Sequence, residues 1–324
     1  MEEVSMPRRK TGEALLKIRC VGICGTDYHA FEGRQPYFTY PRVLGHEISA
    51  EVVESDSGSI LRPGTMVSVL PYYACGNCIA CRRGTPNCCM RIQVAGVHTD
   101  GGFQEYLSIS ESYLVVAETL SSSQLAMIEP LSISAHAVSR SGAGKGDCAL
   151  IMGMGPIGLG IAAISRARGI QVIAIDLNPD RLRFAAEKLG VETTILLNDQ
   201  SLGQVEELTA GEFVPFVFDA TGSKAAIESG LSYLAHGGRF ILVGLQKEAF
   251  AFSHPEFHKR ETTLMSSRNA TRKDFEEVCR LILENRIPTE AFITERVIFD
   301  KLESEFPLLL ARRSELIKVL VDFA

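Results

Sequence analysis

The feature that most constrains the fold is a strand, a glycine turn, a helix and a second strand within residues 147–176. The first strand, Cys148–Met152, runs into Gly153-Met-Gly155-Pro-Ile-Gly158, and the second strand ends at Asp176. Glycines allow a tight turn and a close approach of the backbone to a pyrophosphate, while the helix start offers free N–H groups. The acid, 18 residues after the third glycine, suits a ribose contact. The stretch therefore predicts a dinucleotide-binding βαβ unit.

A membrane-spanning segment is the competing interpretation, because residues 148–164 carry no polar side chain. However, the run is shorter than the roughly 20 apolar residues of a transmembrane helix, and a Gly/Pro turn lies near its start. The net charge of −6 also argues against a nucleic-acid or membrane-surface partner. Residues 1–10 contain no apolar signal region, so we expect a cytoplasmic protein.

Apolar strands continue to alternate with helices after Asp176. A helix is expected from Asn178-Pro179 to Gly190, since proline favours helix starts and glycine favours helix ends. Further strands are predicted at 193–197, 215–219, 239–244 and 262–267, with helical stretches such as 224–235 between them. Together with the first two strands they make six, which predicts an α/β fold with a doubly wound parallel sheet, the Rossmann arrangement.

A smaller β-rich domain is predicted before the glycine turn, because short strands there are punctuated by glycine and proline, beginning with 13–21. The tail, 315–323, predicts a final strand beyond the sixth strand of the parallel sheet, so we expect it to return to this first domain. A length of 324 residues fits two domains. We place their boundaries at 1–132 with 268–324, and at 133–267.

Four of the nine cysteines have the spacing C-x2-C-x2-C-x7-C, namely Cys75, Cys78, Cys81 and Cys89. Four thiolates on a tight loop match a closed tetrahedral zinc site, which would be structural because no coordination position is left open. Cys88 is an alternative fourth ligand because it adjoins Cys89, and an iron–sulfur cluster is an alternative occupant.

A second set of metal-binding side chains is dispersed along the chain: Cys24, His46, Glu47 and Glu129. Each alone fits an ordinary loop or surface position. Together they supply a thiolate, an imidazole and carboxylates, which suits zinc with an exchangeable position. Zinc in such a site acts as a Lewis acid on a substrate oxygen.

The cysteine motif, Cys24-Gly-Thr-Asp-Tyr-His29, Gly45-His-Glu47, Glu129-Pro130 and the glycine turn occur in the order found in one family. The chain resembles the zinc-dependent medium-chain alcohol dehydrogenase superfamily, which combines a GroES-like catalytic domain with a Rossmann domain. Within this superfamily, a glutamate directly after the histidine, as in His46-Glu47, resembles the sorbitol and threonine dehydrogenase branch. Residues 40–47, 96–103, 133–138, 255–263 and 267–271 more narrowly resemble L-galactonate dehydrogenases.

The resemblance implies roles for individual residues. Cys24 and His46 would hold a catalytic zinc with Glu47 or Glu129 as exchangeable ligands, and Asp27 would orient the imidazole of His46. Thr26 and His29 would relay the substrate proton to solvent. The cofactor would contact Gly153, Gly155, Pro156, Ile157, Gly158, Asp176, Leu177, Arg181, Thr221, Val243, Gly244, Ser267 and Arg268. The resemblance further implies two zinc ions per chain, and a homodimer or homotetramer paired through 262–267.

The predicted function is oxidation of a secondary alcohol on a sugar acid or polyol with NAD. Asp176 favours NAD because its carboxylate would repel a 2′-phosphate, whereas Arg181 could recruit that phosphate and favour NADP. An L-threonine or other polyol dehydrogenase is the enzymatic alternative. A non-catalytic zinc-stabilised dinucleotide-binding protein is the alternative from another class, and it would not need Thr26 or His29. Relative to the family, about one strand before Glu13 is missing, and 54–63 is short.

Overall fold

The computed structural model describes residues 2–34 and 38–324, which form two compact units. The first unit comprises Met1–Ser132, Asn269–Glu284 and Thr289–Ala324, and the second comprises Ile133–Arg268 and Asn285–Pro288. The sequence had placed residues 268 and 285–288 with the first domain, whereas they lie in the second unit. Residues 285–288 follow α10 (Arg272–Leu283), a helix of the first unit, but they belong to the second unit. They add no strand to its sheet.

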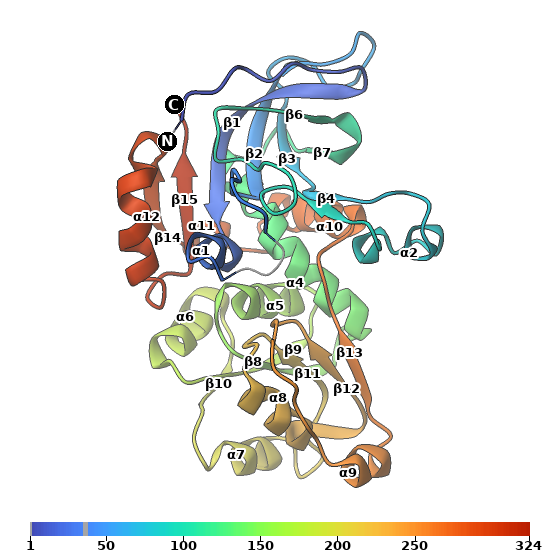
Figure 1. The fold of residues 1–324 in the computed structure, drawn as a ribbon. Helices are drawn as coiled ribbons and strands as arrows, with labels where there is room; N and C mark the ends of the chain where they lie inside the picture. Colours follow the sequence, from blue (N-terminus) through green and yellow to red (C-terminus); the bar gives the residue numbers. More distant parts are fainter. Residues whose placement is uncertain (1, 35–37) are drawn as a thin grey trace. The chain divides into compact units, whose positions relative to one another are not determined.

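A seven-stranded sheet forms the first unit, in the order β14-β15-β1-β2-β3-β7 with β6 paired to β1. These strands are β1 (Glu13–Ile23), β2 (Glu47–Glu54), β3 (Met66–Val69), β6 (Tyr106–Ser110), β7 (Leu114–Val116), β14 (Ile293–Ile298) and β15 (Lys318–Asp322). The tail does return to this unit, because β15 pairs antiparallel with β1 (Figure 1).

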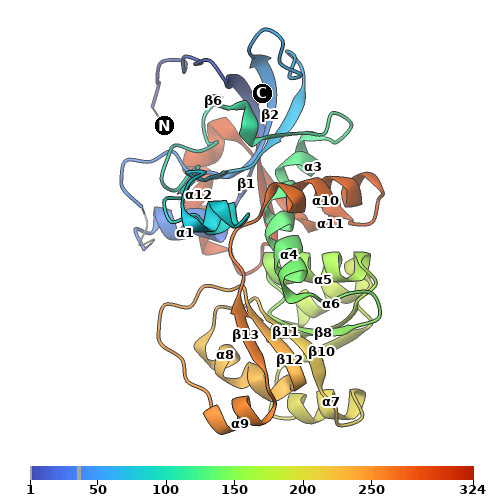
Figure 2. The same ribbon diagram turned by 90° about the vertical axis from the view of Figure 1, so that its right-hand side faces the viewer.

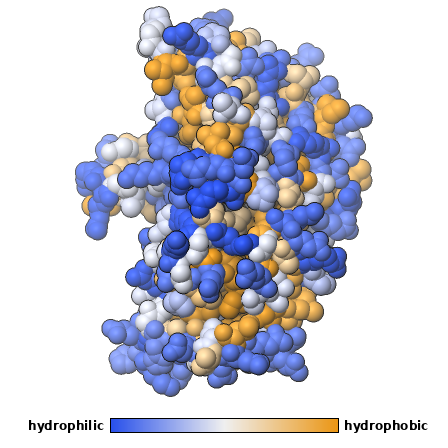
Figure 3. All heavy atoms as spheres, turned by 180° about the vertical axis from the view of Figure 1, so that it is seen from behind, coloured by the Kyte–Doolittle hydropathy of each residue, from blue (hydrophilic) through white to orange (hydrophobic). Residues whose placement is uncertain are grey.

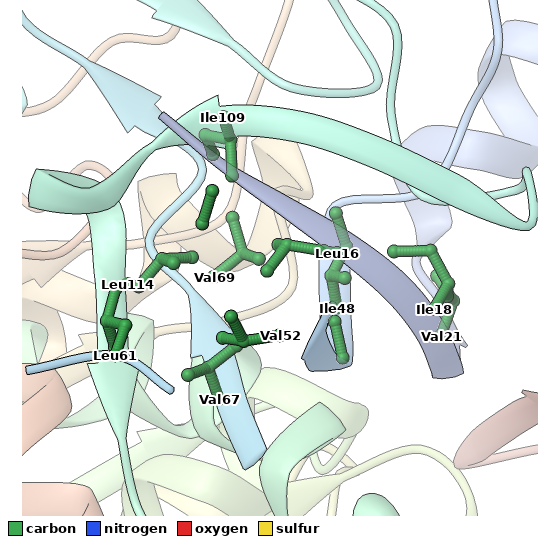
Figure 4. Packing of buried hydrophobic residues seen from close by; sticks show 12 residues of the cluster. Leu16, Ile18, Val21, Ile48, Val52, Leu61, Val67, Val69, Ile109 and Leu114 are labelled. Atoms are coloured by element: carbon green, nitrogen blue, oxygen red, sulfur yellow. The ribbon is translucent and has the colours of Figure 1, made fainter. Parts of the chain in front are cut away.

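Alternation along β1 builds the core of the first unit. Ala14, Leu16 and Ile18 are fully buried, while Lys17 and Arg19, which follow Leu16 and Ile18 in the chain, are partly exposed. Successive side chains of a strand point to opposite faces, so one face of β1 packs inward. Leu16 and Ile18 lie against the aliphatic side chains of β2 and β3 (Figure 4).

Helices and a two-stranded ribbon complete the first unit. They are α1 (Gly25–Phe31), α2 (Ile79–Arg82), α3 (Ser122–Ala126), α4 (Ile128–Ser141, which continues into the second unit), α10 (Arg272–Leu283), α11 (Thr289–Phe292), α12 (Leu302–Ala311), β4 (Tyr72–Tyr73) and β5 (Gln93–Val94). Two of them position functional residues: α1 follows β1 directly, and β4 precedes the cysteine motif.

The second unit contains the predicted six-stranded parallel sheet, in the order β10-β9-β8-β11-β12-β13. Its elements are β8 (Cys148–Met152), α5 (Pro156–Ala167), β9 (Gln171–Asp176), α6 (Pro179–Leu189), β10 (Thr193–Leu196), α7 (Ser201–Leu208), β11 (Val214–Asp219), α8 (Lys224–Gly230), β12 (Leu234–Leu242), α9 (His254–Lys259) and β13 (Thr263–Ser266). Helices α5 and α6 cover one face and α8 the other (Figure 2). The doubly wound Rossmann arrangement is thereby confirmed.

One predicted helix was too long. The sequence suggested a helix over 224–235, but α8 ends at Gly230 and Leu234 already pairs with Val214 at the start of β12. Leu234 is fully buried in the sheet core, so its burial outweighs the local preference for helix. The apolar run 148–164 forms β8 and α5, and within residues 2–34 and 38–324 no helix is long and apolar enough to cross a membrane.

Candidate active site

Cys24, His46 and Glu47 come together in the first unit, with their ligand atoms within 4.8 Å of one another. Cys24 ends the loop between β1 and α1, and His46 lies just before β2, which starts at Glu47. Gly22 makes room for the cluster, since a Cβ there would lie 1.9 Å from Oε2 of Glu47. Neighbouring strands therefore bring together three residues that are separated in sequence. Glu129 lies in α4 and is not a member of this group of three.

Asp27 connects the two segments that carry the cluster. Its Oδ2 accepts the backbone N–H of Cys24 at 2.8 Å, and its Oδ1 accepts that of Gly45 at 3.1 Å. The resemblance implied direct orientation of the imidazole, but Nδ1 of His46 lies 3.9 Å from Oδ1, beyond hydrogen-bond distance. Asp27 is fully buried, and burial raises the pKa of its carboxyl. Its role in this structure is to fix the backbone on both sides of the cluster.

Nδ1 of His46 and Oε2 of Glu129 are among the buried polar atoms that have no hydrogen-bond partner in the described part of the chain. Such atoms are rare in folded proteins and call for an explanation. Burial lowers the pKa of His46, but Cys24 and Asp27 raise it by more, so the net shift is upward. Burial raises the pKa of Glu129 to about 7. A thiol, an imidazole and carboxylates gathered in a buried site, with unused lone pairs, fit a divalent cation such as zinc.

Lys318 is a member of this site that the sequence analysis missed. Its Nζ lies 2.5 and 2.6 Å from the two carboxylate oxygens of Glu47, and both side chains are almost fully buried. The Nζ also donates to the carbonyl of Ile23 at 3.3 Å. Burial lowers the pKa of Lys318, but the attraction of Glu47 and Cys24 outweighs it and the net shift is upward. The available signal was a lysine directly before the apolar run Val319-Leu-Val321, where an unpaired charge would be costly.

Thr26 and His29 lie on α1, three residues apart. Residues with this spacing are neighbours on a helix surface. Thr26 is half-buried and His29 is exposed. Thr26 therefore lies at the start of α1, close to Cys24 in the chain, and His29 lies further along the helix at the solvent-exposed surface.

The cysteine lobe, residues 75–91, brings together Cys75, Cys78, Cys81 and Cys89. The sulfur of Cys78 lies 3.5 Å from that of Cys81 and 3.9 Å from that of Cys89. Four sulfurs at 2.3 Å from a tetrahedral zinc would lie about 3.8 Å apart, so the lobe fits zinc. Among the residues described, Cys88 is exposed and outside the group, whereas Cys89 is buried within it.

Hydrogen bonds favour the thiolate form of Cys75 and Cys78, whereas burial raises the pKa of Cys81 to about 11. The backbone of Asn77 and the side chain of Arg91 lower the pKa of Cys75 to about 5. The backbone N–H groups of Cys75 and Arg91 both donate to the sulfur of Cys89, at 3.2 and 3.3 Å. The lobe forms the mostly hydrophilic projection at the left of Figure 3. Lowered thiol pKa values favour the form that binds metal.

The glycine turn lies between β8 and α5 in the second unit. A different structural reason explains the presence of glycine at each of its three positions. Gly153 has φ +91°, a conformation that disfavours other residues. A Cβ on Gly158 would lie 1.8 Å from the carbonyl oxygen of Gly153. Gly155, the N-cap of α5, has φ −72°, and its Cβ would meet only Arg181 Nη1 at 3.7 Å. The protein's own packing does not require Gly155, so this open space fits a ligand phosphate at the start of α5.

The remaining predicted cofactor residues lie around the carboxyl ends of the sheet strands, where ligands bind in such folds. Asp176 accepts the backbone N–H groups of Met154 and Asn178. The backbone N–H groups of Val243 and Gly244 both donate to the carbonyl of Asp219. The others are Pro156 and Ile157 in the first turn of α5, exposed Leu177, half-buried Arg181, exposed Thr221, Ser267 just after β13, and exposed Arg268.

Comparison with known proteins places this architecture in a family. Residues 10–119 match the alcohol dehydrogenase GroES-like domain, and residues 156–284 match the zinc-binding dehydrogenase domain. The chain is 44% identical over 312 residues to the L-galactonate-5-dehydrogenase of Escherichia coli K12, covering 96% of this chain and 92% of that protein. The chain belongs to the zinc-type alcohol dehydrogenases. This alcohol dehydrogenase is therefore an oxidoreductase of a class that works with zinc and a nicotinamide dinucleotide.

Solved structures of similar dehydrogenases contain a bound dinucleotide. One from Escherichia coli CFT073, in complex with NADH, has a TM-score of 0.91 and 28% identity, covering 99% of this chain and 94% of that one. A zinc-binding dehydrogenase from Sinorhizobium meliloti 1021, bound to NADP, has a TM-score of 0.89 and 28% identity, covering 98% and 94%. Both dinucleotides thus occur among similar structures, and the choice depends on individual residues of this alcohol dehydrogenase.

Proposed function

We propose that this alcohol dehydrogenase oxidises a secondary alcohol of a sugar acid or polyol, such as L-galactonate, and transfers hydride to NAD. The observation that carries the proposal is the group of half-buried Cys24 with buried His46 and Glu47, in which Nδ1 of His46 has no hydrogen-bond partner among the described residues. The choice of substrate class is supported by the 44% identity to an L-galactonate-5-dehydrogenase.

Two zinc ions per chain are part of the proposal. The catalytic one would be held by Cys24 and His46 with Glu47 or Glu129, and the structural one by the four cysteines of the lobe. When bound, the catalytic zinc supplies Lewis-acid polarisation of the substrate oxygen. Asp27 keeps the two ligand-bearing segments in register through the backbone of Cys24 and Gly45.

The substrate hydroxyl must lose a proton as hydride leaves its carbon. Thr26, half-buried beside the cluster on α1, would accept that proton through its hydroxyl and pass its own to His29. His29 is exposed and exchanges protons with solvent. Positioned proton transfer of this kind contributes roughly 10²–10⁴-fold in rate.

NAD is the proposed cofactor because Asp176 ends β9 beside the glycine turn, where its charge disfavours a 2′-phosphate. Arg181 lies close to Gly155 and is the residue that would support NADP instead. Steady-state kinetics with each cofactor decide between them. A higher kcat/KM with NADP would refute the assignment.

The central experiment is an assay of NADH formation with aldonates, polyols and L-threonine as substrates. We expect turnover with a sugar acid such as L-galactonate, and about two zinc ions per chain by elemental analysis. Cys24→Ala should abolish turnover, while NADH still binds with unchanged affinity to the second unit. Full activity after verified removal of all zinc would overturn the proposed mechanism.

We further propose a homodimer or homotetramer assembled through β13. Within the described ranges, β13 is paired only with β12, so its other edge is available to a second copy of the strand. Light scattering of the purified protein tests this. A monomer at micromolar concentration would contradict the proposal.

A further inference from the structure

Tyr72 is a buried residue of the first unit that belongs to none of the predicted sites. Its hydroxyl donates to Oε1 of Glu129, and its side chain is only 6% exposed. The ring of Phe275, in α10, packs edge-on against the ring of Tyr72, with centroids 6.5 Å apart and planes at 84°. Phe275 is itself fully buried, so the position of the tyrosine ring is fixed from behind.

The hydrogen bond makes the two oxygens of Glu129 unequal. Oε1 is occupied by Tyr72, whereas Oε2 is buried and lacks a hydrogen-bond partner in residues 2–34 and 38–324. In Glu47, by contrast, both oxygens contact the ammonium group of Lys318. The two candidate carboxylates are therefore held by different partners, and Glu129 is the one with an unused oxygen.

We propose that Tyr72 is a positioning residue, which orients Glu129 so that Oε2 is the oxygen offered to the catalytic zinc. This inference rests on the proposed zinc site. Residues that hydrogen-bond to a metal ligand fix its orientation, and their removal typically costs roughly 10–100-fold in metal affinity. Because the phenol ring is clamped by Phe275, the hydroxyl is presented from a rigid support.

Tyr72→Phe tests the proposal, because it removes only the hydroxyl and keeps the ring contact. Zinc affinity is measured by competition with a chromophoric chelator, and Cys24→Ser identifies the portion of bound metal that belongs to this site. We expect Tyr72→Phe to lower the affinity there by roughly 10–100-fold. The visible absorption of the cobalt-substituted enzyme should change as well, since it reports the ligand arrangement and not overall stability.

Tyr73→Phe is the matched control. Tyr73 is the next residue of β4, where side chains alternate in direction, and its ring packs on Tyr113. It should leave both zinc affinity and the cobalt spectrum as in the wild type. A second control places Tyr72→Phe in a Glu129→Ala background, where it should have no further effect if Tyr72 acts through Glu129.

The outcomes separate the two proposals. If wild-type protein binds zinc at the Cys24 site, but Tyr72→Phe has wild-type affinity and an unchanged cobalt spectrum, the positioning role is refuted. The role is equally refuted if Tyr72→Phe retains its effect without Glu129. If Cys24→Ser removes no bound zinc from the wild-type level, the proposed metal site itself fails.

Discussion

At the scale of single residues, the ion pair between Lys318 and Glu47 is a strong constraint on the active site. Both groups are almost fully removed from water, so each depends on the other for compensation. The sequence identified Glu47 because it adjoins His46 in a recognisable motif. It could not identify Lys318, because a contact across 271 residues is set by the pairing of β15 with β1 and not by any local pattern.

We expect Lys318→Met to lower the free energy of unfolding by about 3–5 kcal/mol, because Glu47 would remain buried without its counter-ion. Urea denaturation followed by circular dichroism measures the change. Lys301→Met, at an exposed position on the same unit, should fall within about 0.5 kcal/mol of wild type. Equal stability of the two variants would show that the pair contributes little.

At the scale of elements, the glycine turn contains one glycine that the fold requires, Gly158, and one that only a bound ligand would require, Gly155. Gly158→Ala places a methyl group against the backbone oxygen of Gly153, whereas Gly155→Ala meets no close protein atom. We expect Gly158→Ala to cost at least about 1–3 kcal/mol, seen as a lower melting temperature.

Gly155→Ala should keep the wild-type melting temperature and weaken NADH binding by roughly tenfold or more, equivalent to about 1.4 kcal/mol. Titration of NADH fluorescence gives the affinity. Wild-type affinity in this variant would mean that no cofactor atom approaches Gly155 closely.

The elements that the sequence predicted best are those whose signals are local. The β8-turn-α5-β9 unit was recovered because its glycines, its apolar strands and Asp176 all fall within 30 residues. The helix over 224–235 was overextended, because Leu234 joins a strand only when Val214 is beside it. Burial in a sheet is a tertiary effect that local helix preference cannot anticipate.

At the scale of the whole molecule, the two candidate metal sites lie in the first unit and the glycine turn in the second. Ligands that bind only the native state stabilise the part they contact. We expect chelation of zinc to increase hydrogen exchange in residues 75–91 and to leave β8 and β9 unchanged. NADH should instead slow exchange around residues 153–158. Uniform changes across both units would contradict this division.

The pairing of Glu47 with a lysine from the last strand also determines when the site can be completed during protein synthesis. The ribosome makes β1, β2 and the cysteine lobe early, but Lys318 emerges 271 residues after Glu47. Until β15 has docked on β1, the acid of a nascent chain has no cation and stays solvated. The cluster of Cys24, His46 and Glu47 therefore reaches its final electrostatic state only once Lys318 has been synthesised and β15 has docked on β1.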